Sequence, residues 1–340
     1  NVSLAIPHGK TLALIGPSGC GKTMLMRIIA GLEYADSGDV LFDDINVNDL
    51  GPEKRRTGIV FQHYALYPHM TAQENMTTYF LFDKKNRKNE KLKEEIFRQT
   101  SELLGVEMEH LLSKKPPKLS GGDRQRVALG RCITREPNLF LMDEPLANLD
   151  ARERETYRIK LKALLSKLET TALYITHDQH EAMVIGDIIA VMRDGRIEQT
   201  GTFDDVFNHP ANMYVADFIS LTPGVKPVNF FDGRRYADEY AGYTAGVRCE
   251  DTVVNITAGR PGYREIRGTV EAVTHLYSHQ ESYTRVSTEL GDLSSRMAIN
   301  QEIGENMKVW ISFRKIHLFD PDTKVRVHTV DQSKLYTQNM

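Results

Sequence analysis

The chain has 340 residues, enough for two domains that each bury a hydrophobic core. Its 41% apolar and 26% charged content is ordinary for a globular protein, and a net charge of −3 gives no sign of the basic face that nucleic-acid binding needs. No apolar run approaches the roughly 18 residues that span a bilayer, so work at a membrane would require docking on another chain. Three scattered cysteines and the lack of a secretory signal favour a reducing compartment.

The first part of the chain alternates short apolar strands with helical stretches, which is typical of a layered α/β domain. Val2, Leu4 and Ile6 alternate like a strand, and because the chain lacks an initiator Met we expect its true start upstream. The predicted strands are 11–15, 39–42, 57–61, 139–142, 172–176 and 188–192, and the predicted helices are 21–30, 84–104 and 151–168. Asp194-Gly195 is a hairpin turn signal.

The sequence changes character at a cluster of helix and strand breakers, Pro223, Gly224 and Pro227. Beyond it, short β-like runs at 252–256, 266–275, 282–286 and 308–313 are separated by turn signals such as Gly291-Asp292. This spacing predicts a small barrel or sandwich. We therefore expect a first domain over 1–220, with a helical subdomain at about 72–135, and an all-β domain over 221–340.

A glycine-rich motif follows the first predicted strand and matches G-x-x-x-x-G-K-[ST]. Its residues are Gly16, Pro17, Ser18, Gly19, Cys20, Gly21, Lys22 and Thr23. Glycines let backbone N–H groups surround phosphate oxygens, and the helix N-terminus adds partial positive charge. Lys22 is expected to reach the β- and γ-phosphates of ATP, and Thr23 to offer its hydroxyl to Mg²⁺. A chance match on a glycine-rich turn would not explain the flanking strand and helix.

The predicted strand 139–142 ends in two carboxylates, Asp143 and Glu144. A carboxylate at a strand tip beside a phosphate loop can hold Mg²⁺, which is the role expected of Asp143. Glu144 can polarise the water that attacks the γ-phosphate. The alternative is that the pair merely ends the strand before Pro145, and a phosphate loop in the same chain argues against it.

Residues 119–126 read L-S-G-G-D-R-Q-R and resemble the signature L-S-G-G-Q-x-Q-R of ABC ATPases. Ser120, Gly121 and Gly122 open a helix, so backbone amides can meet a phosphate there as well. The resemblance implies that two copies face each other, and that each signature completes the ATP site of the other copy. A plain capped helix start, with Ser120 as the N-cap, is the alternative reading.

Further elements follow in the order of the ABC family. Gln62 lies where the Q-loop is expected and would contact Mg²⁺ or water, Asp150 lies in the expected D-loop, and His177 resembles the switch histidine that steadies the γ-phosphate and water. The resemblance covers residues 1–220 and implies the α/β P-loop NTPase fold of ABC nucleotide-binding domains. It also implies that an aromatic residue upstream of Asn1 stacks on adenine.

Two positions depart from the family pattern. Asp123 replaces the signature Gln and places a carboxylate near a site for phosphate, which implies weaker closure unless Arg124 offsets it. Cys249 replaces the Pro of a G-[IV]-R-P-E-[HD] turn at 246–251. This turn and the segment 315–320 resemble the OB-like (TOBE-like) regulatory β-barrel of carbohydrate importer ATPases, and that barrel could bind a regulatory protein.

The segments 61–71 and 146–151 are also similar to ATPases of carbohydrate importers, of the maltose and glycerol-3-phosphate types. In that group the stretch from Gln62 to Met70 grips the transmembrane permease subunits. The resemblance implies a homodimer at the cytoplasmic face of the membrane that hydrolyses ATP to energise uptake of a sugar, polyol or sugar phosphate. Importers of polyamines, iron or anions share most of these motifs. ABC ATPases of DNA repair or of ribosomes are a further alternative.

Overall fold

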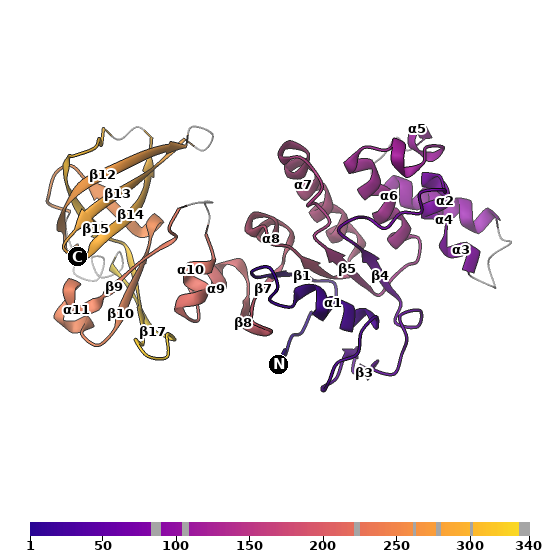
Figure 1. Cartoon of the computed structure of the whole chain (residues 1–340), viewed down its shortest axis with the longest axis horizontal. Coiled ribbons are helices and arrows are strands. Elements are labelled where there is room, and N and C mark those ends of the chain that lie inside the picture. The colour runs from indigo at the N-terminus through magenta and orange to yellow at the C-terminus, as the bar shows by residue number, and fades with distance from the viewer. Residues whose placement is uncertain are drawn as a thin grey trace. The chain divides into compact units, whose positions relative to one another are not determined.

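The computed structural model describes residues 1–82, 90–103, 109–220, 225–260, 263–276, 280–299 and 302–332. The chain forms two compact units, Asn1–Phe203 and Asp204–Met340 (Figure 1). In this described part of the chain, none of the helices combines the length and apolar character that a bilayer crossing requires.

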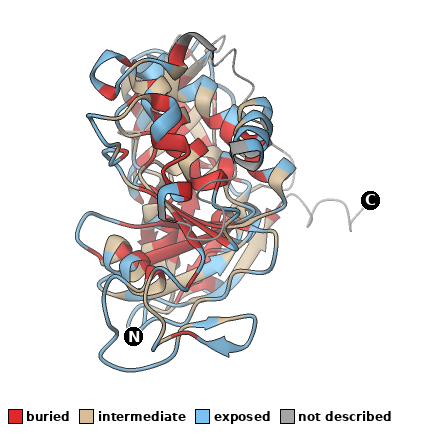
Figure 2. Cartoon of the chain, turned by 90° about the vertical axis from the view of Figure 1, so that its right-hand side faces the viewer, coloured by how far each residue is buried: buried red, intermediate tan, exposed pale blue. Residues whose placement is uncertain are grey.

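A six-stranded sheet in the order β4-β5-β6-β1-β7-β8 forms the centre of the first unit (Figure 2). Its strands are β1 (Thr11–Ile15), β4 (Thr57–Val60), β5 (Leu139–Asp143), β6 (Thr171–Ile175), β7 (Ile188–Arg193) and β8 (Arg196–Gly201). All neighbours pair in parallel except β8, which runs antiparallel to β7. A small separate hairpin joins β2 (Leu41–Phe42) and β3 (Ile45–Asn46). The parallel strands therefore bring their carboxyl ends to one edge of the sheet.

Helices cover both faces of this sheet, namely α1 (Lys22–Ala30), α6 (Gly121–Ile133), α7 (Ala151–Leu168) and α8 (Gln179–Ile185). The first unit also contains α2 (Ala72–Met76), α3 (Tyr79–Phe82), α4 (Glu90–Leu103) and α5 (Glu109–Leu112), and of these α2 and α4 pack on α6. Alternate side chains of β5 enter two different cores: Leu141 lies in the core that contains α1, whereas Phe140 and Met142 lie in the core that contains α6 and α7. Burial on both faces explains why the central strands are continuous apolar runs.

Most predicted elements of the first unit are confirmed, and β1 and α7 have the predicted bounds. Asp194-Gly195 makes the turn between β7 and β8. The prediction of a strand over residues 2–6 is wrong, because among the described residues no strand pairs with this segment. Leu4 and Ile6 are instead half-buried and pack against the core around α1. The helix predicted over 84–104 is observed as α4, whereas residues 84–89 and 104 lie outside the described residues.

The second unit is built from two antiparallel sheets, as the all-β prediction requires. One contains β9 (Val228–Asp232), β10 (Thr244–Arg248), β16 (Lys315–Phe319) and β17 (Arg326–Asp331), and the other contains β11 (Thr252–Asn255), β12 (Ile266–Leu276), β13 (Glu281–Thr288), β14 (Gly291–Ala298) and β15 (Lys308–Phe313). They share one core, to which Val247 and Leu318 contribute from the first sheet and Val270 and Ile311 from the second. The turn expected at Gly291-Asp292 lies two residues earlier, because both residues already pair in β14.

The short helices α9 (Phe203–Asn208) and α10 (Met213–Phe218) pack on the second unit, although the sequence predicts a domain boundary near residue 220. The buried Arg248 explains this difference. Its guanidinium donates to the carbonyls of Phe207 at 2.9 Å and Ile219 at 3.0 Å, at the carboxyl ends of the two helices. A cation at a helix C-terminus stabilises the unpaired carbonyls there. Pro223 and Gly224 of the expected breaker cluster lie outside the described residues.

Candidate active site

The phosphate loop, residues 16–23, connects β1 to α1 and has a backbone that only glycine tolerates at three points. Gly19 and Gly21 have φ values of +79° and +110°, in the left-handed region. A Cβ on Gly16 would lie 2.2 Å from the carbonyl oxygen of Met192 on β7. The loop tip at Pro17, Ser18 and Gly19 is exposed, whereas Cys20 is buried.

Lys22 is buried at the base of this loop, and its ammonium donates to the carbonyls of Gly16 at 2.8 Å and Pro17 at 3.0 Å. The first turn of α1 contains no acidic residue, and its N-cap, Gly21, offers no side chain to the backbone amides. The amides at the start of α1 thus keep their partial positive charge for an anion.

Thr23 and Asp143 come together at the carboxyl edge of the sheet, as the sequence predicts. The Thr23 hydroxyl donates to Oδ1 of Asp143 at 3.3 Å. Burial raises the pKa of the Asp143 carboxyl, and the Thr23 hydrogen bond opposes that rise together with the more distant Arg27 and Lys22. Among the described residues no three His, Cys, Asp or Glu side chains converge on a metal position. A hydroxyl and one carboxylate nevertheless fit Mg²⁺, which usually takes few protein ligands and completes its shell with phosphate oxygens and water.

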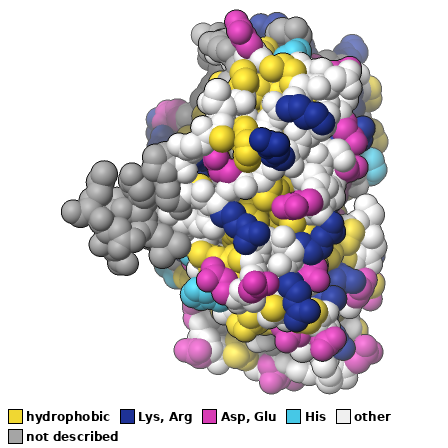
Figure 3. Space-filling model, turned by 90° about the vertical axis from the view of Figure 1, so that its left-hand side faces the viewer, with side chains coloured by type: hydrophobic (Ala, Val, Ile, Leu, Met, Phe, Trp, Pro, Cys, Tyr) yellow, Lys and Arg dark blue, Asp and Glu magenta, His cyan; other side chains and the backbone are white. Residues whose placement is uncertain are grey.

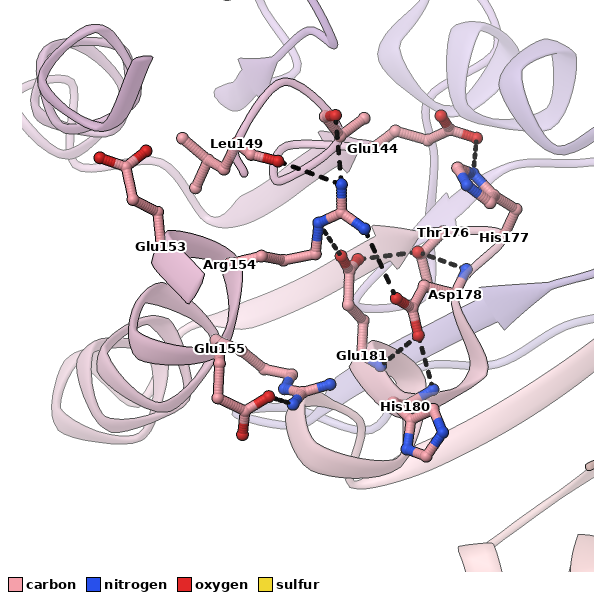
Figure 4. A network of polar contacts seen from close by, with 12 residues as sticks. Glu144, Leu149, Glu153, Arg154, Glu155, Thr176, His177, Asp178, His180 and Glu181 are labelled. Carbon is pink, nitrogen blue, oxygen red and sulfur yellow. Dashed lines mark hydrogen bonds and ion pairs between the residues drawn. The ribbon is translucent and has the colours of Figure 1, made fainter. Parts of the chain in front are cut away.

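Glu144 is contacted by two other predicted residues that are distant from it in sequence, Gln62 and His177. Its Oε2 accepts a hydrogen bond from Gln62 Nε2 at 3.3 Å. Its Oε1 lies 2.9 Å from Nδ1 of His177 (Figure 4). The backbone of Glu144 has a φ of +46°, and its N–H donates to the carbonyl of Ile175 on β6. A non-glycine residue held in this conformation is typical of a functional site. The carboxylate can accept a proton from a water positioned between these groups.

The segment from Gln62 to Met70 has a fixed shape. Tyr64 and Ala65 both have positive φ, and Arg131 of α6 donates to their carbonyls at 2.9 and 2.7 Å. Asn75 is fully buried, exchanges two hydrogen bonds with the backbone of Tyr67, and also donates to the carbonyls of Met70 and Thr71. This segment is therefore organised by contacts within the first unit.

Ser120 begins α6 as its N-cap. Its hydroxyl accepts from the N–H of Asp123 at 3.2 Å and donates to the Asp123 carboxylate at 2.8 Å. The cation paired with Asp123 is Arg126, at 3.7 Å, whereas Arg124 donates to the carbonyl of Leu119. Arg126 rather than Arg124 therefore offsets the carboxylate in this structure, because the i,i+3 position places Arg126 on the same helix face.

The two signature glycines pack closely against neighbouring groups, Gly122 more tightly than Gly121. A Cβ on Gly122 would lie 2.5 Å from the Tyr157 hydroxyl, and a Cβ on Gly121 would lie 3.3 Å from the carbonyl of Asn148. None of the contacts among the described residues joins Ser120, Gly121 or Gly122 to the phosphate loop of the same chain. The signature and the phosphate loop do not make one site within a single chain.

Asp150 begins α7, where its carboxylate accepts from the N–H of Glu153 at 2.8 Å. Asn148 in the same loop donates to the carbonyl of Gln62 and links the expected D-loop to the expected Q-loop. Arg154, four residues after Asp150, donates to the Leu149 carbonyl at 3.1 Å.

Sequence reasoning missed Arg154 and the buried Glu181, whose Oε1 lies 4.0 Å from Nε of Arg154 (Figure 4). Spacing provides a signal for both residues. Arg154 follows Asp150 by one helical turn, and Glu181 follows His177 by the same interval. Residues four apart lie on one helix face. The side chain of Arg154 can therefore face the loop that contains Asp150, and that of Glu181 the loop that contains His177.

A phosphate loop beside two carboxylates at the end of a parallel strand defines the class of nucleotide-hydrolysing proteins. Sequence comparison assigns the chain to a family of this class. The profile described as ABC transporter matches residues 1–147. The sn-glycerol-3-phosphate import ATP-binding protein UgpC of Bartonella quintana is 39% identical over 337 residues, which cover 96% of this chain and 93% of that protein. The chain belongs to the ABC transporter family and is an ATP-hydrolysing subunit of that family.

Other relatives place it more narrowly. The trehalose/maltose import ATP-binding protein MalK of Thermococcus litoralis is 40% identical over 358 residues, covering 95% of this chain and 93% of that protein. Among solved structures, the dimeric bacterial ABC transporter cassette MJ0796 superposes with a TM-score of 0.53 at 32% identity, over 59% of this chain and 89% of that chain. A post-hydrolysis state of that cassette, bound to ADP and Pi, superposes with a TM-score of 0.51. The predicted resemblance to importer ATPases and the predicted fold class are confirmed.

Proposed function

We propose that this chain binds ATP on residues 16–23 and hydrolyses it at Glu144. Lys22, Ser18 and the loop amides hold the phosphates, because they provide donors and positive charge at the base of α1. Glu144 takes up a proton from the attacking water, and His177 and Gln62 keep the carboxylate aimed at it. The observation that carries this proposal is the convergence of Gln62 and His177 on Glu144.

Thr23, Asp143 and Gln62 are the residues that would hold Mg²⁺. When bound, Mg²⁺ would supply positive charge that neutralises the negative charge developing on the phosphates during transfer. The contact between the hydroxyl of Thr23 and the carboxylate of Asp143 supports this assignment, because both are oxygen ligands.

A second copy of the chain completes the site in this proposal. His177 is 60% exposed and Glu144 21% exposed, so the reacting groups lie open to a partner. Ser120, Gly121 and Gly122 of the second copy would meet the γ-phosphate, and Asp150 would lie at the contact between the copies. The dimeric state of the structurally similar cassette supports a homodimer.

In this proposal, ATP hydrolysis by the dimer drives import through transmembrane permease subunits. The shaped segment from Gln62 to Met70 would grip them, and the exposed Tyr67 supports this role. The chain would then act peripherally at the cytoplasmic face of the membrane. The names of its relatives favour a sugar, polyol or sugar phosphate as cargo over polyamines, iron or anions.

We also propose that the first domain acts as the ATPase and that the two-sheet second domain binds a regulatory protein. The face of the second unit drawn in Figure 3 carries basic and acidic side chains mixed with apolar ones. A transient protein contact has much the same composition as the rest of a protein surface, so this face is compatible with such a contact.

Glu144→Gln tests the proposed function. The amide keeps the size of the side chain but cannot accept the proton, so the turnover number should fall about 100-fold or more. ATP binding, measured with a fluorescent nucleotide, should remain. Replacement of the exposed Glu33 by Gln is the matched control and should leave turnover at the parent rate. Parent-level hydrolysis by Glu144→Gln would exclude Glu144 as the base.

A further inference from the structure

Arg154 lies between the two loops that carry the reacting side chains (Figure 4). We propose that it is a positioning residue, which holds these loops together so that Glu144 and His177 keep their contact of 2.9 Å. This inference rests on the proposed function of Glu144 and His177. It adds a residue that touches neither nucleotide nor the reacting atoms.

One side of the Arg154 guanidinium binds the loop that follows Glu144. It donates to the carbonyls of Leu149 at 3.1 Å and Ala147 at 3.5 Å. The N–H of Ala147 in turn donates to the carbonyl of Glu144 at 3.1 Å. Arg154 therefore fixes the end of a tight turn whose first residue is the proposed base.

The other side of the guanidinium faces the loop that carries His177. Its NH1 lies 4.0 Å from Oδ2 of Asp178, and its Nε lies 4.0 Å from Oε1 of Glu181. Asp178 directly follows His177, and its other carboxylate oxygen caps α8 by accepting from the N–H groups of His180 and Glu181. The position of His177 is thereby tied to the first turn of α8.

Glu181 is the fixed point of this second loop. It is buried, and its Oε2 accepts hydrogen bonds of 2.8 Å from the hydroxyls of Tyr174 and Thr176. A buried carboxylate next to a second carboxylate, Asp178, needs a nearby cation, and Arg154 supplies it. Removing that cation would leave two like charges to move apart, and His177 would move with them.

Arginine suits this place better than lysine. A planar guanidinium offers five donors in a fixed fork, so it can bind the carbonyls of one loop and face the carboxylates of the other at once. A lysine ammonium is a compact point charge on a flexible stem. It would keep the charge but lose the geometry that joins the two loops.

The first test replaces Arg154 in the full chain and separates turnover from binding. Arg154→Met should lower kcat by about 10- to 100-fold, because a shift of about 1 Å in reacting groups has an effect of this size. The Kd for ATP should stay within about twofold of the parent, since the phosphate loop is unchanged. Arg154→Lys should recover part of kcat. Arg152→Met, an exposed arginine on the same helix, is the control and should match the parent.

A double-mutant cycle that combines Arg154→Lys with Asp178→Asn provides a test that does not depend on Arg154→Met folding well. Asparagine keeps the helix cap but removes the charge. If Arg154 acts through Asp178, the combined loss of kcat should be smaller than the product of the single losses. If the combined loss of kcat equals the product of the two single losses, the proposal that Arg154 acts through Asp178 is wrong.

The remaining outcomes separate the two proposals. If Arg154→Met and Arg154→Lys both keep kcat within twofold of the parent, or if both lose ATP binding and turnover together, Arg154 is not a positioning residue. If Glu144→Gln turns over at the parent rate, the proposed function fails whatever Arg154 does. If Glu144→Gln is inactive while Arg154→Met is fully active, only the present inference fails.

Discussion

The carboxylate of Asp123 accepts the hydrogen bond of Ser120 and lies 3.7 Å from Arg126, so the hydroxyl proposed to meet the second copy's ATP is already engaged. Arg126 is held in turn by the Tyr157 hydroxyl at 2.6 Å. An incoming γ-phosphate would have to displace Asp123 from Ser120 and approach a negative charge. We therefore expect the single departure from the family signature to weaken the proposed contact between copies.

Asp123→Gln, made in the inactive Glu144→Gln background, should tighten the dimer that forms with Mg-ATP. Removing the charge removes its repulsion of the incoming phosphate, and we expect the dimer dissociation constant to fall about fivefold, or roughly 1 kcal/mol. Sedimentation velocity measures it. Asp123→Glu keeps both the charge and the capping arrangement and should resemble the parent. Equal dimer constants for the Gln and Glu variants would contradict the prediction.

At the scale of elements, the outer face of β10 and β16 depends on covering by α9 and α10. A Cβ on Gly246 of β10 would lie 2.8 Å from the ring of Phe319, so this position packs without a side chain. The neighbouring Arg248 lies 4.0 Å over the ring of Phe207 and is almost fully buried. His317 of β16 is buried on the same face, and its Nδ1 lies 2.9 Å from the Thr329 hydroxyl.

His317 should make the stability of the second unit depend on pH. Burial, and next the charge of Arg248, lower its pKa to about 3 from 6.5. The unfolded chain therefore binds a proton below pH 6.5 that the folded chain does not bind until about pH 3. The contribution of neutral His317 to the free energy of unfolding is therefore fully present above pH 6.5. It decreases as the pH falls, by about 1.4 kcal/mol between pH 7.5 and 5.5.

His317→Gln should remove this contribution of about 1.4 kcal/mol, because glutamine does not titrate. Urea unfolding at the two pH values measures it, and the fluorescence of Trp310, the chain's single tryptophan, reports on the second unit. His328→Gln, at an exposed position on β17, is the matched control and should keep the parent's pH dependence. The same pH dependence in His317→Gln and in the parent would exclude His317 as its source.

For the whole molecule, the separation of the signature from the phosphate loop predicts complementation between two inactive chains. Lys22→Met disables its own phosphate loop, whereas Ser120→Asp keeps the helix cap but adds a charge that repels phosphate. Each variant alone should be inactive. In an equal mixture about half of the dimers are mixed and half of their sites are intact, so about a quarter of the parent rate should return.

The control for complementation is a mixture in which both chains carry Lys22→Met, one of them with Ser120→Asp as well. Every phosphate loop is then disabled, so no site can be intact and no activity should return. Failure of the first mixture to recover activity, with both chains folded and able to associate, would count against sites shared between copies.

The sequence by itself determined the phosphate loop, the strand that ends in Asp143 and Glu144, and the helix over residues 151–168. These features are local: a glycine pattern between a strand and a helix, or an apolar run that ends in carboxylates, has one favoured structure. The all-β character of the second unit followed in the same way from runs and turns. The short alternation at residues 2–6 misled, because a strand needs a partner that the pattern cannot specify.

Tertiary structure decided which residues meet. Gln62, Glu144 and His177 converge because parallel strands bring their carboxyl ends to one edge, although 82 and 33 residues separate the other two from Glu144. Arg126 rather than Arg124 pairs with Asp123, because helix geometry and Tyr157 set its direction. The place of α9 and α10 with the second unit depends on the buried guanidinium of Arg248, which joins segments distant in the chain. The spacing of Asp150 and Arg154 indicates that Arg154 faces its own loop, but only the fold brings Asp178 and Glu181 to its other side.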